Sequence, residues 1–415
     1  MREMKPSSME WVGDIPASWK VMPNKYLMHK KKEICPVYNG EDILSLTMKG
    51  VIVRDLDAGG KMPASFDGYQ RLEPGNLLMC LFDIDVTPRC IGLIKQAGLS
   101  SPAYSQFVLC DDANAAYYCY YYTMLDNDKT LLHLAKNLRH SLTEDQLGAI
   151  PVIVPPTDEQ HRIADFLDAK CAEIDALTTD IQAQIDTLEQ YKRSIITETV
   201  TKGLNLDAEM KDSGVFYMAP MNASWRLTKI GYICTKLSRS FVSEDTALIC
   251  SNKGKVQIRA DDLTGIMVSD DNAMQGIRAG DIAIHGMDTW HGAIALSEFD
   301  GKITRVVHVC DSTEDKRFIV YYMQHLAFQG VYKLISNGVR GNTSDFRSWD
   351  KVRDIWIAIP KTRQEQEAIC DYLDRQCNAV EEVISTKKQQ LEVLATYKKS
   401  LIFEYVTGKK EVPLS

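Results

Sequence analysis

Long apolar runs and secretion signals are missing from this 415-residue sequence. No stretch reaches eighteen consecutive apolar residues, and residues 1–20 contain no apolar run of the signal-peptide type. The eleven cysteines form no Cys-x-x-Cys pair, so neither a zinc site nor a disulfide framework is predicted. We therefore expect a cytoplasmic protein with reduced, mostly buried thiols and no membrane association.

Sequence motifs for catalysis and cofactor binding are missing as well. The sequence has no Gly-x-x-x-x-Gly-Lys-Ser/Thr loop, no Asn/Asp-Pro-Pro-aromatic tetrad of the adenine methylases, and no glycine-rich cofactor loop after a strand. His285, His291 and Asp281 do not have the spacing of a standard metal site. We therefore expect a non-enzymatic chain with no cofactor or metal of its own.

The net charge of −8 at first argues against a nucleic-acid partner, because phosphates favour a basic surface. The acidic excess lies mainly in residues 151–212, which have 13 acidic and 6 basic side chains. Residues 1–150 have 18 acidic and 16 basic side chains, and residues 213–355 have 16 and 17. The acidic segment is therefore expected to face protein or solvent, while the other two are near neutral.

The sequence contains an internal repeat with a period of 206 residues. Residues 159–201 match residues 365–407 at sixteen identical positions. Between these blocks only fragments correspond, such as Lys49-Gly50 with Lys253-Gly254. The framework of the repeat is thus preserved, whereas the interiors of the two copies have diverged.

Each repeated block is predicted to be a long helix, with Thr157-x-x-Gln160 and Thr362-x-x-Glu365 as its capping box. Seam residues recur every seven positions, which is typical of a coiled coil. The predicted seam consists of Leu167, Ile174, Ile181, Gln184, Leu188, Ile195, Leu373, Val380, Gln390, Leu394 and Leu401. Alternate seam positions, matched between the copies, are Ile163, Leu177, Tyr191, Ile369, Val383 and Tyr397.

The two helices are expected to run antiparallel. The second globular segment leaves the end of the first helix and leads into the second, and the ends of a domain usually lie close together. About 44 residues at about 1.5 Å each give a helix of roughly 66 Å, with the globular segments at its opposite ends. This arrangement has approximate internal two-fold symmetry, which lets one polypeptide imitate a DNA-binding dimer with spaced half-sites.

The globular halves, residues 20–150 and 226–355, are predicted to mix helices with strands. Short apolar runs bounded by Gly, Pro and Asp are typical of buried strands. They lie at 76–82, 282–284 and 305–309. Helices are expected near 113–137 and 314–336. The tyrosines between 117 and 122 fit core packing better than stacking on extruded bases.

Three short motifs punctuate the repeat. Residues 8–19 contain a Trp-x-Gly-x-Ile-Pro stretch before a second Trp, residues 200–205 follow the first helix, and residues 406–409 follow the second. In the second copy, residues 216–225 lack the Gly and the Ile-Pro. With these motifs, nearly the whole sequence resembles the specificity (S) subunits of type I restriction-modification systems.

The resemblance implies an α+β protein whose two mixed α/β target recognition domains each read one half of a bipartite double-stranded DNA site. The helices then separate these domains and dock two methyltransferase (M) subunits, through which restriction (R) subunits join. S-adenosylmethionine, ATP and Mg²⁺ are implied only for those partners. The implied divisions are recognition domain 1 (1–155), spacer helix 1 (156–203), recognition domain 2 (204–359) and spacer helix 2 (360–411).

Basic residues of the two variable halves are the candidates for DNA contact, because Lys and Arg bind phosphates and Arg also reads guanine. These candidates are Lys49, Arg54, Arg139, Lys253, Lys255, Arg259, Arg305, Arg340 and Arg347. The alternative function is a coiled-coil scaffold or adaptor with two protein-binding globular ends, which the near-neutral halves also allow.

Overall fold

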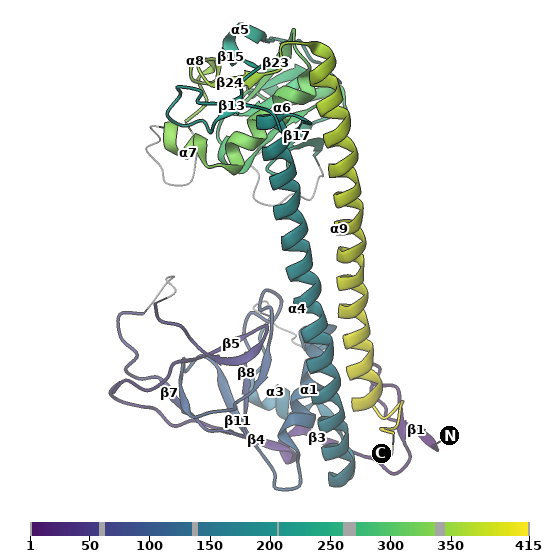
Figure 1. Ribbon diagram of the computed structural model, residues 1–415. Coiled ribbons are helices and arrows are strands. Elements are labelled where there is room, and N and C mark those ends of the chain that lie inside the picture. The colour runs from purple at the N-terminus through teal and green to yellow at the C-terminus, as the bar shows by residue number, and fades with distance from the viewer. Residues whose placement is uncertain are drawn as a thin grey trace. The chain divides into compact units, whose positions relative to one another are not determined.

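The computed structural model describes residues 2–57, 63–134, 140–205, 207–259, 271–336 and 345–413 (Figure 1). The chain divides into two compact units. Unit 1 consists of Met1–Ile181 and Lys388–Ser415, and unit 2 of Gln182–Lys387. Each unit has its own globular segment and takes part of both long helices, α4 (Thr157–Lys202) and α9 (Arg363–Val406).

Unit 1 mixes short strands and helices, as its alternating apolar runs predict. Its strands are β1 (Met4–Pro6), β2 (Asp14–Pro16), β3 (Lys20–Pro23), β4 (Met28–Lys31), β5 (Leu44–Thr47), β6 (Gly50–Val53), β7 (Gln70–Leu72), β8 (Leu77–Met79), β9 (Ile91–Leu93), β10 (Gly98–Ser100), β11 (Ser105–Leu109) and β12 (Pro151–Val154). Its short helices are η1 (Asn24–Tyr26), α1 (Ala115–Asn127), α2 (Thr130–Leu134) and α3 (Glu144–Ala149).

Unit 2 repeats the order of the strands. Its strands are β13 (Met210–Lys211), β14 (Met221–Asn222), β15 (Arg226–Lys229), β16 (Cys234–Lys236), β17 (Leu248–Ser251), β18 (Lys255–Ile258), β19 (Met274–Ile277), β20 (Ile282–His285), β21 (Ile294–Leu296), β22 (Gly301–Thr304), β23 (Val307–Ser312) and β24 (Trp356–Ile359). Its short helices are α5 (Ile230–Ile233), η2 (Asp271–Ala273), η3 (Thr289–His291), α6 (Lys316–Phe328), α7 (Val331–Ile335) and α8 (Trp349–Arg353).

Both units are built around a four-stranded antiparallel sheet of the same order. In unit 1 the order is β4-β11-β8-β9, and in unit 2 it is β16-β23-β20-β21. The smaller two-stranded sheets also correspond, for instance β5–β6 with β17–β18. The α+β class and the duplicated architecture expected from the sequence are therefore confirmed.

Aromatic side chains form much of each core. Tyr117, Tyr118, Tyr121 and Tyr122 of α1 are at most 1% exposed, so their assignment to core packing is confirmed. Burial raises the pKa of Tyr121 well above its ordinary value. Tyr322 of α6 is likewise buried in the core of unit 2.

A tryptophan–glutamate hydrogen bond recurs at the start of each long helix. Trp19 Nε1 donates to Glu159 at 2.9 Å, and Trp225 Nε1 donates to Glu365 at 2.9 Å. Both indoles are at most 1% exposed. The recurrence shows that the sequence repeat preserves individual side-chain contacts as well as topology.

The predicted capping box is wrong at the first helix, and at the second only its threonine half forms. At the first helix Thr157 Oγ1 donates to Asp112 O at 3.1 Å, and Gln160 N–H donates to Pro156 O at 3.0 Å. Gln160 makes its bonds across the fold, accepting from the backbone N–H of Asn114 at 2.8 Å and donating to Pro155 O at 2.9 Å. Glu365 N–H does donate to Thr362 Oγ1 at 3.3 Å, but the Glu365 carboxylate binds the tryptophan instead of the backbone. Tertiary partners thus replace the local ones that the motif predicts.

Within unit 1 the segments of α4 and α9 lie side by side and run antiparallel. The rings of Phe166 and Tyr405 lie 4.4 Å apart, and Asp175 accepts from Lys398 at 2.6 Å. Contacts further along α4 therefore fall on earlier residues of α9, which is the antiparallel order expected from the sequence.

The helix segments of unit 2 pair in the same sense. Lys387 donates to Gln184, and Lys192 donates to Glu381, each at 2.5 Å. Lys387 interrupts the apolar stripe of α9, and its partner Gln184 explains how the pair accommodates the charge.

The buried stripe is narrower than the predicted seam. Buried seam positions are Leu167, Ile174, Ile181, Leu373, Val380 and Leu401, and half-buried ones are Leu188, Ile195 and Leu394. Exposed ones are Gln184 and Gln390, together with the alternate positions Leu177, Tyr191, Val383 and Tyr397. Five of these six residues thus lie outside the buried stripe, whereas Gln184, although exposed, still contacts α9 through Lys387.

Candidate nucleic-acid interface

The lysines expected to bind DNA near Gly50 and Gly254 lie at the turns of equivalent hairpins. Lys49 is exposed between β5 and β6, and Lys253 is exposed between β17 and β18. The glycine after each lysine has a positive φ, 91° at Gly50 and 69° at Gly254, a backbone conformation that favours glycine. Two separate turns thus present an exposed lysine next to a glycine of positive φ.

Four other candidates for DNA contact are not exposed like these lysines or lie outside the described residues. Arg54 and Arg259 are half-buried, and their backbone N–H groups donate to Ile43 O and Ala247 O at 2.7 and 2.9 Å. Arg139 and Arg340 lie outside the described residues.

Arg305 and Arg347 are brought together in unit 2, although 42 positions separate them in the sequence. Gly286 joins their segments, because its N–H donates to Val306 O at 2.9 Å and its carbonyl accepts from Phe346 N–H at 3.0 Å. A Cβ at Gly286 would lie 2.8 Å from Phe346 O, so this junction requires glycine. Both arginine side chains are exposed, and the junction therefore presents two guanidinium groups.

A buried histidine is hydrogen-bonded to the backbone of this arginine junction. His308 is 1% exposed, and its Nε2 lies 2.7 Å from Phe346 O, which can only accept, so Nε2 carries the hydrogen. Burial lowers the pKa of His308, and the bond to Phe346 opposes that shift only in part. The neutral imidazole thus fixes the backbone directly before Arg347.

Unit 1 has the same junction with different chemistry. Leu142 N–H donates to Leu81 O at 2.8 Å, the counterpart of the bond between Phe346 and Gly286. Beside it, His140 Nδ1 lies 3.0 Å from an Asp85 oxygen, and the hydrogen bond to His140 lowers the pKa of Asp85. A similar pair, His285 with Asp288 at 3.2 Å, lies beside the junction of unit 2. The positions that correspond to Arg305 and Arg347 hold Pro102 and Thr143 in unit 1, both exposed and uncharged.

Lys255, another candidate for DNA contact, has a partner within the protein. Its Nζ donates to Glu381 of α9 at 2.5 Å. Arg305 and Arg347 also contact the protein through one nitrogen each. Arg305 Nε donates to Met274 O at 2.9 Å, and an Arg347 Nη donates to Met287 Sδ at 3.1 Å. The other N–H groups of both guanidinium groups remain for a ligand.

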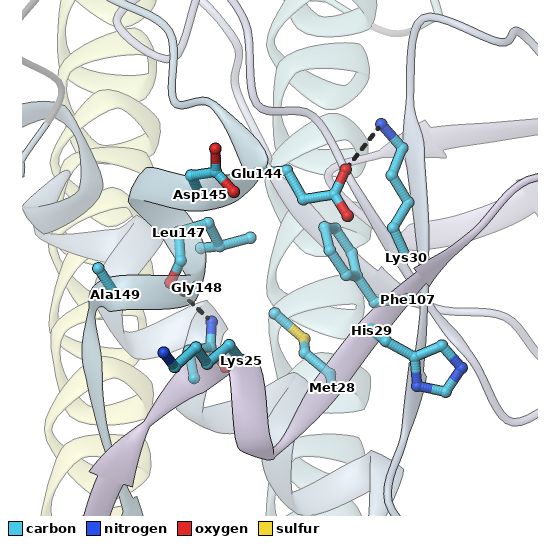
Figure 2. A pocket seen from close by; sticks show the side chains of 11 residues that line it. Lys25, Met28, His29, Lys30, Phe107, Glu144, Asp145, Leu147, Gly148 and Ala149 are labelled. Atoms are coloured by element: carbon cyan, nitrogen blue, oxygen red, sulfur yellow. Dashed lines mark hydrogen bonds and ion pairs between the residues drawn. The ribbon is translucent and has the colours of Figure 1, made fainter.

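Sequence reasoning missed a basic run, His29 to Lys32, whose first three residues lie on the edge strand β4 of unit 1. Figure 2 shows the adjoining cavity of about 390 Å³, where Lys30 faces Glu144 at 3.6 Å. Lys31 pairs with Glu73 at 2.5 Å. The signal was the longest run of basic residues in the sequence. Charged residues on an edge strand also prevent sheet-to-sheet aggregation, so the run is not specific for DNA.

The described part of the chain contains no group of three or more His, Cys, Asp or Glu side chains that could hold a metal ion. None of the helices in that part is both long and apolar enough to cross a membrane.

Comparison with known proteins identifies a domain and a fold. The family described as "Type I restriction modification DNA specificity domain" matches residues 103–187. No curated protein sequence matches the chain. A chain from the structure named "Structural basis underlying complex assembly and conformational transition of the type I R-M system" has a TM-score of 0.68 at 13% identity, covering 95% of this chain and 99% of that chain. At this identity the likeness shows a shared fold.

Two further structures are similar at lower TM-scores. The HsdS subunit from Thermoanaerobacter tengcongensis has a TM-score of 0.46 at 13% identity, covering 95% of this chain and 98% of that chain. The type I restriction-modification system S subunit from M. genitalium has a TM-score of 0.40 at 13% identity, covering 93% and 96%.

Proposed function

We propose that this chain, which belongs to the type I restriction-modification specificity subunits, recognises a bipartite double-stranded DNA target, with one half-site read by each unit. Members of this family direct DNA recognition and carry no catalytic cofactor. The proposal also holds that each unit contains one recognition domain, that M subunits dock on the chain and that R subunits join through them. It further holds that the complex acts in the cytoplasm.

The observation that carries the proposal is a duplicated fold with chemically different exposed junctions. The same sheet and the same tryptophan–glutamate bond recur in both units. At the equivalent positions, however, unit 2 has Arg305 and Arg347, whereas unit 1 has Pro102 and Thr143. Arginine bonds bidentately to guanine, which proline and threonine cannot do, so the two junctions suit different sequences.

Docking of M subunits is supported by exposed apolar residues on the long helices. In unit 1, Leu177 and Tyr397 are 48% and 53% exposed, and in unit 2 the equivalent Val383 and Tyr191 are 45% and 53% exposed. Each unit thus offers an aliphatic residue on one helix and a tyrosine on the other. Equal patches in both units fit two copies of one partner.

Methylome sequencing of cells that carry this chain with its M subunit tests DNA recognition. The expected result is a bipartite target with two unlike half-sites. Methylation without a sequence-specific target would refute the proposal and favour the scaffold function. Specific binding should also weaken steeply as salt rises, because phosphate contacts release counterions.

The docking face is tested by Tyr191→Ser and Tyr397→Ser, singly and together. Each single change should remove one of two M subunits from the purified complex, and the double change should remove both, as measured by native mass spectrometry. Tyr26→Ser is the matched control, since Tyr26 is 64% exposed in unit 1 but lies on η1, away from the long helices in sequence and contact. Full retention of M by the double variant would exclude this face.

A further inference from the structure

The hairpin β17–β18 of unit 2 is anchored to two helices beside its turn. Lys255, the first residue of β18, donates to Glu381 Oε2 of α9 at 2.5 Å. Gln324 Nε2 of α6 lies 3.5 Å from Gly254 O, and a Cβ built at Gly254 would lie 2.5 Å from that nitrogen. The turn that presents Lys253 is therefore fixed at two neighbouring points.

Glu381 holds two ammonium groups at once. Lys192 of α4 donates to Oε1 at 2.5 Å, while Lys255 donates to Oε2. Burial by itself would raise the pKa of Glu381, but the hydrogen bonds from the two lysines outweigh it and lower the pKa. The carboxylate is 33% exposed, so solvent screens this network less than a fully exposed pair.

Unit 1 repeats the hairpin but replaces all three anchoring side chains. Val51 takes the place of Lys255 after the turn glycine. Asp175 takes the place of Glu381, and Thr123 takes the place of Gln324. Asp175 retains the pairing between the long helices, with Lys398 at 2.6 Å. Among the described residues, nothing lies within 4 Å of a Cβ built at Gly50.

These shorter side chains leave open space under the unit 1 hairpin. A cavity of about 580 Å³ lies there, and Val51, Thr123, Asp175 and Lys398 are among the residues that line it. The two units therefore share the hairpin and the ion pair between the long helices, and differ in whether the hairpin is fastened to them.

We propose that Lys255, Glu381 and Gln324, the hairpin clamp, are positioning residues that hold the β17–β18 turn in place for DNA reading by unit 2. The inference rests on the proposed function. A turn that is already ordered loses less conformational freedom on binding, so clamping strengthens recognition of the half-site that unit 2 reads. The clamp also connects this turn to Lys192, the neighbour of Tyr191 on the proposed docking face.

Hydrogen exchange of the full-length protein tests the anchoring without DNA. Glu381→Gln and Lys255→Gln should each accelerate amide exchange in residues 248–258 by about three- to tenfold, as expected for loss of one partly buried ion pair. Asp175→Asn is the matched control, because it breaks the equivalent pair in a unit without the hairpin link. It should leave exchange in residues 44–53 unchanged. Unchanged exchange in residues 248–258 of both unit 2 variants would overturn the clamp.

A gain-of-function variant provides the converse test. Val51→Lys, Thr123→Gln and Asp175→Glu together install the clamp in unit 1, so exchange in residues 44–53 should slow by about three- to tenfold. Slower exchange supports the assignment of the three anchors. Unslowed exchange in a folded triple variant would show that these side chains do not hold the hairpin.

The complex with M subunits tests the role in recognition. Glu381→Gln should reduce methylation at least threefold and make it tolerant of changes in one half-site only. Because this change leaves Lys255 in place, stronger methylation would show that the lysine itself contacts DNA and would overturn the clamp. Faster exchange with unaltered recognition of both half-sites would also overturn it, and the proposed function would stand. A wild-type complex without any specific target would instead refute the proposed function, and the reading role of the clamp with it.

Discussion

A buried histidine makes the stability of unit 2 sensitive to mild acid. His325 of α6 is 4% exposed, and its Nδ1 lies 3.1 Å from Thr197 Oγ1 of α4. Burial lowers the pKa of His325 from an ordinary 6.5 to about 4. In unit 1 the corresponding positions hold Met124 and Phe403, two apolar side chains.

The direction of the effect follows from the depressed pKa. Above about pH 6.5 His325 is neutral in both the folded and the unfolded chain, so its contribution to stability is fully present. As the pH falls toward 4, the unfolded chain binds the proton first and unfolding becomes more favourable. Between pH 7 and pH 5, protonation of this one side chain costs unit 2 about 2 kcal/mol of unfolding free energy.

His325→Met, which copies the residue of unit 1, removes this dependence. Thermal unfolding and amide exchange of α6, compared at pH 7 and pH 5, should show that the wild type loses about 2 kcal/mol more than the variant. His285 and His308, whose pKa values burial also lowers, are present in both proteins, so their effects cancel. His133→Met, at an exposed position, is the control. An equal loss in wild type and variant would refute the reasoning.

Three further predictions concern the junction, the repeated contact and the thiols. Arg305→Ala and Arg347→Ala should weaken binding of one half-site by about 1–3 kcal/mol in the assembled complex, and undiminished binding by both would remove them from the interface. Trp225→Phe deletes the donor to half-buried Glu365 and should destabilise unit 2 by about 1–3 kcal/mol in thermal unfolding, while equal stability would show that the bond contributes nothing. Of the eleven free cysteines only Cys110 is exposed, and burial raises the pKa of most of the others. A thiol reagent should therefore modify one site quickly, and Cys110→Ser should abolish that reaction.

Much of the fold could be predicted because the sequence repeats its framework. Sixteen identities between residues 159–201 and 365–407 identify two equivalent helices, and the matched Trp19 and Trp225 occupy equivalent buried sites. The matched Lys49-Gly50 and Lys253-Gly254 fragments likewise lie at equivalent turns, since glycine accepts the positive φ found there. These features depend on residues that are close in sequence or copied in it.

Contacts between distant residues could not be predicted in this way. Periodicity placed Tyr191 on the seam, yet it is exposed, and the buried positions in that part of α4 include Ile185 and Ile196 instead. The globular core of unit 2, against which Ile196 packs, determines which residues of this part of α4 are buried. A heptad pattern describes a helix by itself, while burial depends on which surface meets that helix.

The amino-acid sequence by itself determined the duplication, the long helices and their antiparallel order, because each follows from periodicity or from chain connectivity. Only the tertiary structure decided that Arg305 meets Arg347 at Gly286, and that Lys255 binds Glu381 although 126 positions separate them. The divergent interiors offer no internal copy to compare, and the partner of a charged side chain is set by distances in the folded chain. For that reason the differences between the two units, on which the proposed recognition depends, emerged only from the fold.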